Sequence, residues 1–273
     1  MGTIVGGFAT SHILFAPDGS EEQAERVFQG MLQIRDQVRA LKPDVLVLIG
    51  ADHLNNFNLS KQITLAVGVA DAFTTLGDGV PVTTFPGKRD FAEGFARFAA
   101  ENDFEIVQVE EVTPDHGTAT PRFLIDPQGD IPTVPIFVNT AMPVPPSPTR
   151  CYQLGEVLKR AICEQRPADE RVVIVGHGGL SHWVRVAEQG RIAEEFDRQC
   201  IELLTAGRGS ELLSLSTADF IERSGNGGIE VLSWLVMAGA LGPDARGQCI
   251  YYEAMPSWMT GMGGISLLPC AAT

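Results

Sequence analysis

The sequence predicts an α/β fold: a single domain, residues 1–273, with a central mixed or largely parallel sheet flanked by helices. Continuous runs of β-branched and leucine residues, of which Asp44–Gly50 is the clearest, are typical of strands buried on both faces. These runs alternate with longer segments, such as Glu21–Leu41, in which apolar residues recur at helical spacing. Alternation of the two patterns along a chain indicates helices packed on a central sheet.

The elements are expected in the following order. The strand Ile4–Ala9, the helix Glu21–Leu41 and the strand Asp44–Gly50 form a first strand–helix–strand unit. Further strands are predicted at Thr64–Val69, Glu105–Val109, Thr133–Val138, Arg171–Val175 and Cys249–Tyr252, and further helices at Asp90–Glu101, Cys151–Gln165, Gly190–Thr205 and Gly228–Ala240. The proline-rich segment Ala141–Tyr152 is short, which favours a surface connection inside one domain over a linker between two.

Composition limits the possible functions. With 44% hydrophobic and 20% charged residues the chain is globular, and 273 residues can enclose a large core. The net charge of −14 argues against nucleic acid or an anionic membrane surface as a partner. The start of the chain lacks the basic region of a signal peptide, and no apolar run approaches the roughly 20 residues of a membrane span, so we expect a cytoplasmic protein. The five cysteines show no CxxC spacing and are expected to be reduced.

The histidines share a position in the predicted topology. There are five, namely His12, His53, His116, His177 and His182, and each follows a strand or lies in a polar turn. Any single one could simply cap a turn. Ligands of α/β proteins bind outside the carboxyl ends of the strands, where residues distant in sequence converge, so the set as a whole predicts one site.

Metal chemistry suits such a set. No GxGxxG follows the first strand, and neither a GxxxxGK[ST] nor a GxSxG motif is present, which argues against dinucleotide, triphosphate and serine-hydrolase chemistry. Histidines combined with a carboxylate and no cysteine pair favour a divalent ion of the iron, zinc or manganese group. The spacing of His12 and His53 excludes an HExxH helix.

Four acids are candidates for the carboxylate. Asp52 and Asp115 directly precede histidines, so we expect them to point elsewhere and to orient a loop or bond a ring nitrogen. Glu230 lies among apolar neighbours, where an acid is costly unless it is paired or bound to a metal. A carboxylate stabilised by a helix N-terminus is the alternative interpretation of Glu230, and Glu253 is the second candidate for the ligand.

Five segments in this order resemble the class III extradiol ring-cleavage dioxygenases, the family of the protocatechuate 4,5-dioxygenase β subunit. They are "IVGGFATSH", "ADHLNNF", "DHGTATP", "GGLSHW" and "GGIEVLSWLVMAGAL", and they span nearly the whole chain. The resemblance implies that His12, His53 and Glu230 hold a non-haem Fe(II). It also implies that His182 is the catalytic acid/base and that His116 is a second catalytic histidine of the pocket.

The resemblance leaves the substrate contacts open. His177 departs from the family pattern, in which a small or hydroxylated residue is more familiar, and it could reach the rim of the pocket or pack at the strand end. We place it with Asn55 and Asn56 as a candidate substrate-binding residue. Arg122, Arg150 and Arg185 are further candidates for binding an acidic group on the ring, and none of them can be assigned.

The function implied is extradiol cleavage of a catecholic compound with O₂, the substrate being a protocatechuate-like or gallate-like acid or a related diol. An aminophenol or a hydroxypyridine would chelate the same ion. The alternatives are a zinc-dependent, hydrolase-type relative, since zinc accepts the same ligands, and a non-catalytic paired subunit of a dioxygenase. We expect a homo-oligomer, or a chain that needs a separate small subunit.

Overall fold

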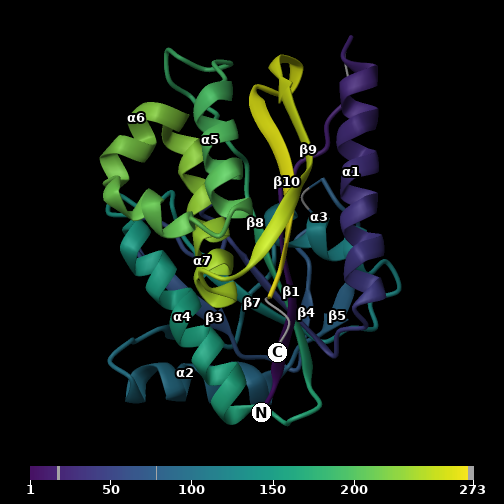
Figure 1. The fold of residues 1–273 in the computed structure, drawn as a ribbon, viewed down its shortest axis with the longest axis vertical. Coiled ribbons are helices and arrows are strands. Elements are labelled where there is room, and N and C mark those ends of the chain that lie inside the picture. Colours follow the sequence, from purple (N-terminus) through teal and green to yellow (C-terminus); the bar gives the residue numbers. More distant parts are fainter. Residues whose placement is uncertain (17–18, 78, 270–273) are drawn as a thin grey trace.

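A mixed sheet of eight strands forms the centre of the protein in the computed structural model, which describes residues 1–16, 19–77 and 79–269 (Figure 1). Side by side, its strands are β6 (Val107–Val109), β3 (Leu65–Gly68), β7 (Thr133–Val138), β2 (Val45–Gly50), β8 (Arg171–His177), β1 (Thr3–Thr10), β10 (Thr260–Leu268) and β9 (Arg246–Met255). Two short strands, β4 (Ala72–Thr74) and β5 (Thr84–Pro86), pair separately.

The middle of the sheet is parallel. Strands β7, β2, β8 and β1 run in one direction, whereas β10 is antiparallel to β1 and β9 is antiparallel to β10. The register places Thr10 beside His177 and Ile49 beside Gly176. The carboxyl ends of β1, β2 and β8 therefore meet at one edge of the sheet.

Helices cover both faces of the sheet. The helices α1 (Glu21–Ala40) and α3 (His116–Ile125) lie on one side, at the right in Figure 1. On the other side lie α2 (Arg89–Glu101), α4 (Pro148–Gln165), α5 (Glu194–Thr205), α6 (Thr217–Gly228) and α7 (Leu232–Leu241). Short 3₁₀ turns at Gly209–Ser214, Ile229–Val231 and Pro256–Trp258 complete the described elements. No helix of the described residues is both long and apolar enough to cross a membrane.

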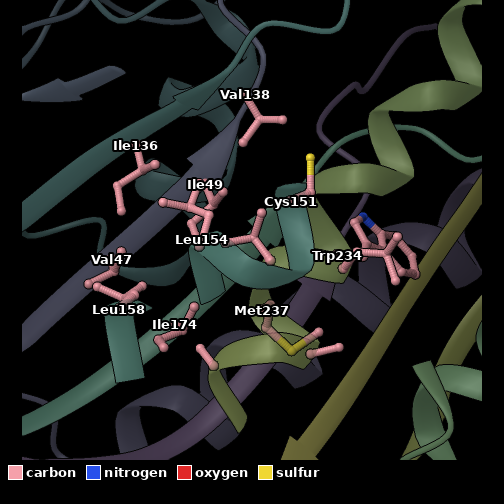
Figure 2. Packing of buried hydrophobic residues seen from close by; sticks show 14 of the residues in the cluster. Val47, Ile49, Ile136, Val138, Cys151, Leu154, Leu158, Ile174, Trp234 and Met237 are labelled. Carbon is pink, nitrogen blue, oxygen red and sulfur yellow. The ribbon is translucent and has the colours of Figure 1, made fainter. Parts of the chain in front are cut away.

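The larger core lies between the parallel strands and the pair α4 and α7. Side chains of β2, β7 and β8, such as Ile49, form one buried cluster there with Leu154 of α4 and Trp234 of α7 (Figure 2). The two helices approach at glycines: a Cβ at Gly155 would lie 2.0 Å from the carbonyl oxygen of Val236. The close approach fixes α7, and with it the turn that precedes α7, against the strand ends.

The predicted fold class is confirmed, and the differences lie in individual elements. The helix expected from Gly190 begins at Glu194, and the helix expected from Gly228 begins at Leu232 after a 3₁₀ turn. The sequence analysis missed β4, β5, α3, α6 and β10. Strand β10 lacks an apolar pattern because it contains Gly261, Gly263 and Gly264, which make room for side chains packed on it: a Cβ at Gly264 would lie 2.3 Å from the ring of Tyr251.

The described cysteines form no disulfide bond with one another. Cys151, Cys163, Cys200 and Cys249 are free, and Cys151 and Cys200 are buried as expected of small apolar side chains. Cys249 is exposed on β9. Cys270 lies outside the described residues.

Candidate metal centre

The edge formed by the ends of β1, β2 and β8 gathers the histidines. His12 lies two residues beyond β1, His53 lies three residues beyond β2, and His177 is the last residue of β8. His116 is the first residue of α3. His53 has a positive φ of 47°, a left-handed conformation that turns the chain sharply after β2.

Four imidazole rings form one cluster. The ring centroid of His12 lies 4.9 Å from that of His53, 5.6 Å from that of His116 and 5.7 Å from that of His177. His53 stacks on His116 with 4.6 Å between the ring centroids. One ring nitrogen each of His12, His53 and His116 lies within 4.8 Å of the others, a spacing that allows them to hold one metal ion.

Glu230 brings a carboxylate into this cluster. It lies in the 3₁₀ turn Ile229–Val231 between α6 and α7 and is buried. Its Oε1 lies 3.0 Å from Nε2 of His53, and its Oε2 lies 3.6 Å from Nε2 of His12 and accepts a hydrogen bond from the backbone N–H of Gly179. Burial alone would raise its pKa, but the adjacent histidines hold the pKa well below its usual value, so the carboxylate is ionised, and the imidazolium of His53 provides the opposite charge.

His53 is held by carboxylates on both sides. Its Nδ1 lies 3.0 Å from Oδ2 of Asp115, and its Nε2 faces Glu230. Burial lowers its pKa, but hydrogen bonds to Asp115 and Glu230 outweigh burial and raise the pKa to about 10. Burial raises the pKa of Asp115, but the hydrogen bond to His53 outweighs burial and brings that pKa down to about 2. The pair is therefore an imidazolium and a carboxylate.

His12 has a different environment. It is buried, and burial takes its pKa well below the usual value despite the attraction of Glu230. Its Nδ1 lies 3.4 Å from Nδ1 of His177. His177 is fully buried, and its pKa falls to about 3 because burial disfavours the charged form. His12 and His177 are thus two neutral rings, and a hydrogen bond between them requires a proton on one of the two facing Nδ1 atoms.

His182 lies in the loop that follows β8, in which Gly179 donates to Glu230. Nδ1 of His182 donates a hydrogen bond to the carbonyl oxygen of Leu180, 2.8 Å away, and since a carbonyl oxygen only accepts, the proton of the neutral ring is on Nδ1. The backbone of His182 is fixed by Ser224, Gly227 and Gly228 at the end of α6. Gly179, which donates to Glu230, also approaches this ring: a Cβ there would lie 2.8 Å from Cε1 of His182. His182 is half-buried, so its ring has access to solvent.

The structure does not test the predicted substrate contacts, which stay predictions. The amide of Asn55 donates to Asp115, and the amide of Asn56 bonds Asp52 and the backbone carbonyl of Thr113. Asp52 accepts from the backbone N–H groups of Asn56 and Phe57, so it orients the loop, as expected. Both asparagines therefore support the loop that carries His53.

Other candidates lie apart from the cluster. Glu253 forms an ion pair with Arg26 of α1, 2.6 Å between Nε and Oε1, whereas Glu230 and Asp115 are the acids that contact His53. Arg122 is buried against Asp126, and Arg150 stacks on Phe104. Arg185 lies in the exposed stretch after His182.

The sequence analysis missed the support of the His182 loop. Asp197 of α5 is buried and accepts hydrogen bonds from the backbone N–H and the hydroxyl of Ser181 and from the hydroxyl of Tyr252. A buried acid within an amphipathic helix is the only signal that could have identified it. Asp197 therefore anchors the residue next to His182.

This arrangement of histidines and one carboxylate at the ends of parallel strands agrees with the comparison with known families. Residues 7–263 match the family described as the catalytic LigB subunit of aromatic ring-opening dioxygenase. The chain belongs to this family. As a LigB-type protein it is an enzyme of the extradiol ring-cleavage dioxygenase class, and the resemblance noted from the sequence motifs is confirmed.

Curated relatives of this LigB-type chain carry the same kind of activity in their names. The 2,3-dihydroxyphenylpropionate/2,3-dihydroxicinnamic acid 1,2-dioxygenases of Escherichia coli K12 and of Escherichia coli O157:H7 are each 25% identical to it, over 91% of this chain and 93% of theirs. A solved structure of an uncharacterized protein, JW3007, from Escherichia coli K12 matches with a TM-score of 0.65 and 17% identity, over 96% of this chain and 99% of that one. The solved structure supports the fold.

Proposed function

We propose that this dioxygenase uses Fe(II), held by His12, His53 and Glu230, to open the ring of a small catecholic compound. The observation that carries the proposal is the convergence of Nε2 of His12 and Nε2 of His53 on the two oxygens of the buried Glu230 carboxylate. Two imidazoles and one carboxylate are a donor set that suits Fe(II) and leaves positions open for substrate and O₂. When bound, the ion would supply a Lewis acid for the diol and a place to bring O₂ to it.

The choice of Glu230 as the third ligand rests on charge. His116 also lies within reach of His12 and His53. A buried, ionised carboxylate needs a compensating charge, however, and a divalent cation between the three side chains would provide it and replace the proton on Nε2 of His53. His116 is half-buried and stacks on His53, and we propose that it bonds the substrate oxygen.

His182 is the proposed acid/base. Its Nδ1–H is occupied by the Leu180 carbonyl, which leaves Nε2 as the atom able to take a proton from a diol hydroxyl and return it. Its loop is anchored through Ser181 to Asp197, which is not a proposed metal ligand. His53, His116 and His182 retain exposure whereas His12, His177 and Glu230 are buried, so we place the substrate on the side of the first three.

The substrate proposed is a small aromatic diol. The loops that follow His12, His53 and His182 expose apolar side chains at Leu14, Phe15, Leu54 and Val184, which suit an aromatic ring or an apolar substituent. The similarity to dihydroxyphenylpropionate dioxygenases supports a diol with an acidic side chain as one candidate substrate. Protocatechuate-like and gallate-like acids are the other candidates. We further propose a single catalytic domain that assembles with copies of itself or with a small subunit.

The test begins with metal. The protein should bind one Fe(II) in an anaerobic titration and then consume O₂ with at least one compound from a panel of catechol, protocatechuate, gallate, 2,3-dihydroxyphenylpropionate and 2-aminophenol. Bound iron with no O₂ uptake from any of them would overturn the proposal. Ring or amide hydrolysis by the zinc-loaded protein without O₂ would support the hydrolase alternative instead, and bound iron without turnover by the isolated chain would fit a non-catalytic subunit.

Substitutions test the roles separately. His12→Ala, His53→Ala or Glu230→Ala should abolish iron binding, whereas His182→Ala should retain iron and slow turnover by roughly 10²- to 10⁴-fold. Glu253→Ala is the matched control, because that acid lies in a peripheral ion pair with Arg26. Loss of iron in Glu253→Ala or in His116→Ala, with retention in Glu230→Ala, would show that the carboxylate is misassigned.

A further inference from the structure

His177 lies directly behind the ring of His12. It is fully buried at the end of β8, and its Nδ1 lies 3.4 Å from Nδ1 of His12. Nε2 of His177 has no hydrogen-bond partner among the described residues. Two facing imidazole nitrogens can form a hydrogen bond only if one carries a proton and the other does not. The contact therefore admits two arrangements.

We propose that His177 is a positioning residue that accepts a hydrogen bond from Nδ1–H of His12 and so presents the unprotonated Nε2 of His12 to the metal. The inference rests on the proposed metal site and extends it by one residue. Nε2 of His12 is the nitrogen that faces Oε2 of Glu230, at 3.6 Å. It can bind a cation only when the proton of the neutral ring is on Nδ1, the atom that meets His177.

The opposite arrangement is incompatible with a metal ligand. If Nδ1 of His177 donated to His12, the proton of neutral His12 would move to Nε2 and block the atom that faces Glu230. Binding of a cation therefore selects the tautomer in which His177 accepts at Nδ1 and carries its own proton on Nε2. In this arrangement His177 holds the proton of His12 on Nδ1 without touching the cation.

The surroundings of His177 hold its ring in place. A Cβ at Gly50 would lie only 1.9 Å from Cε1 of His177, so the absence of a side chain at the end of β2 provides the space for the ring. Ser233 donates one hydroxyl that reaches the backbone carbonyls of both His177 and Glu230, at 2.7 and 2.9 Å. The same residue thus couples the support of His12 to the turn that carries the carboxylate.

The two histidine ligands receive different support. Nδ1 of His53 bonds the carboxylate of Asp115, whereas Nδ1 of His12 bonds an uncharged imidazole. A carboxylate partner raises the basicity of a ligating histidine more than a neutral acceptor does. The geometry accordingly assigns His177 an orienting role, in place of the substrate contact predicted from sequence, because its buried ring meets His12 and Gly50.

The proton positions can be observed directly. Long-range ¹H–¹⁵N spectra of the protein labelled at its five histidines, with zinc as a diamagnetic probe, distinguish protonation at Nδ1 from protonation at Nε2. The zinc-loaded protein should show His12 protonated at Nδ1 and His177 protonated at Nε2. Protonation of His177 at Nδ1 in that state would overturn the inference even though the metal is bound.

Paired substitutions provide a second measurement. His177→Leu removes the acceptor at similar size, and His177→Asn retains an oxygen acceptor near the position of Nδ1. Chelator competition should show Fe(II) bound roughly 10- to 100-fold more weakly by His177→Leu, with most of the loss restored in His177→Asn. Thermal unfolding of the metal-free variants separates a folding defect from a change at His12.

The outcomes distinguish this inference from the proposed function. A protein that binds neither Fe(II) nor zinc contradicts both. Tight metal binding by His177→Leu, equal to that of the unchanged protein, contradicts the role of His177 alone. Equal weakening in His177→Leu and His177→Asn, with equally lowered metal-free stability, would show that His177 only fills space and would also contradict the inference.

Discussion

At the scale of single residues, the site is a set of side chains whose charge states depend on one another. The buried carboxylates of Asp115 and Glu230 are both stabilised by the imidazolium of His53. Sequence neighbours do not provide this stabilisation, since Asp115 and His53 are separated by 62 positions. The charge states therefore follow from contacts in space and not from the motifs that contain these residues.

Asp115 should make the free energy of unfolding of the metal-free protein decrease measurably at low pH. Its folded pKa of about 2 is depressed relative to the usual 3.8, so its contribution to the free energy of unfolding is complete above about pH 4 and is lost as the pH falls toward 2. The full contribution is about 2 kcal/mol, of which about 1 kcal/mol should be lost between pH 5 and pH 3. Urea unfolding of the unchanged protein and Asp115→Asn at both values measures this loss.

Asn55 provides the control for this measurement. It donates to the same oxygen of Asp115 but does not ionise, so Asn55→Ala should lower stability with a pH dependence close to that of the unchanged protein. If the difference in stability between the unchanged protein and Asp115→Asn were the same at pH 5 and pH 3, the ion pair between Asp115 and His53 would not exist in the metal-free protein.

At the scale of elements, the loop that carries His182 is held by a helix that contributes no proposed ligand. Asp197 of α5 accepts three hydrogen bonds, two from Ser181 and one from Tyr252 of β9. Burial raises the pKa of Asp197, so the cost of desolvation offsets part of what these bonds contribute. The net effect is to fix the loop from both α5 and the edge of the sheet.

Asp197→Ala should slow turnover while leaving metal binding intact. The substitution frees Ser181, next to His182, and leaves the donors of Ser181 and Tyr252 without their acceptor, so we expect a loss of about 2 kcal/mol in stability and a lower kcat. Steady-state kinetics and Fe(II) titration together check this. Tyr252→Phe, which removes only one of the bonds, is the matched control and should lose about 1 kcal/mol. Unchanged kcat in Asp197→Ala would contradict the anchoring role.

The close approach of α4 and α7 should make the stability of the protein sensitive to substitution of Gly155. Gly155→Ala would place a methyl group 2.0 Å from the Val236 carbonyl oxygen, and the helices must separate to accommodate it. Overpacking of this kind costs about 1–3 kcal/mol. Urea denaturation should reveal it, and Gly94→Ala, at a position of α2 with open space around it, serves as the control that should not be destabilised. Equal stability of the two variants would indicate that α4 and α7 pack less tightly than described.

At the scale of the whole molecule, the proposed ligands come from segments far apart in the sequence. His12 follows β1, His53 follows β2, and Glu230 precedes α7, which packs on β8 and β1. A ligand that binds this set therefore binds the folded state and not the unfolded chain, and it stabilises the fold by an amount that rises with the logarithm of its concentration divided by its dissociation constant.

Metal should raise the melting temperature. With free Fe(II) or zinc at 100 times the dissociation constant the expected stabilisation is about 2.7 kcal/mol, which corresponds to a rise of about 5 °C for a chain of this size. Differential scanning calorimetry under anaerobic conditions measures the shift. Glu230→Ala should show no rise, and Glu253→Ala should match the unchanged protein. A rise that persists in Glu230→Ala would place the bound metal elsewhere.

The sequence by itself determined the fold class and the dioxygenase family. Continuous apolar runs and helical periodicity indicated a layered α/β protein, because a strand buried on both faces is apolar throughout and a helix buried on one face has apolar residues at helical spacing. Elements whose packing relies on glycine or on short turns, such as β10 and α3, show neither pattern in the sequence and were missed.

Only the tertiary structure decided which of the histidines and acids meet. The separation of Glu230 from Glu253, the bond between Asp115 and His53, and the position of His177 behind His12 all depend on strand register and helix packing, which bring together residues more than 60 positions apart. Hydrogen bonds and charge pairs act over a few ångströms in space and are independent of separation along the chain. For that reason "IVGHGGLSHW" contains two histidines with separate surroundings, His177 against His12 and His182 beside Gly179 and Leu180.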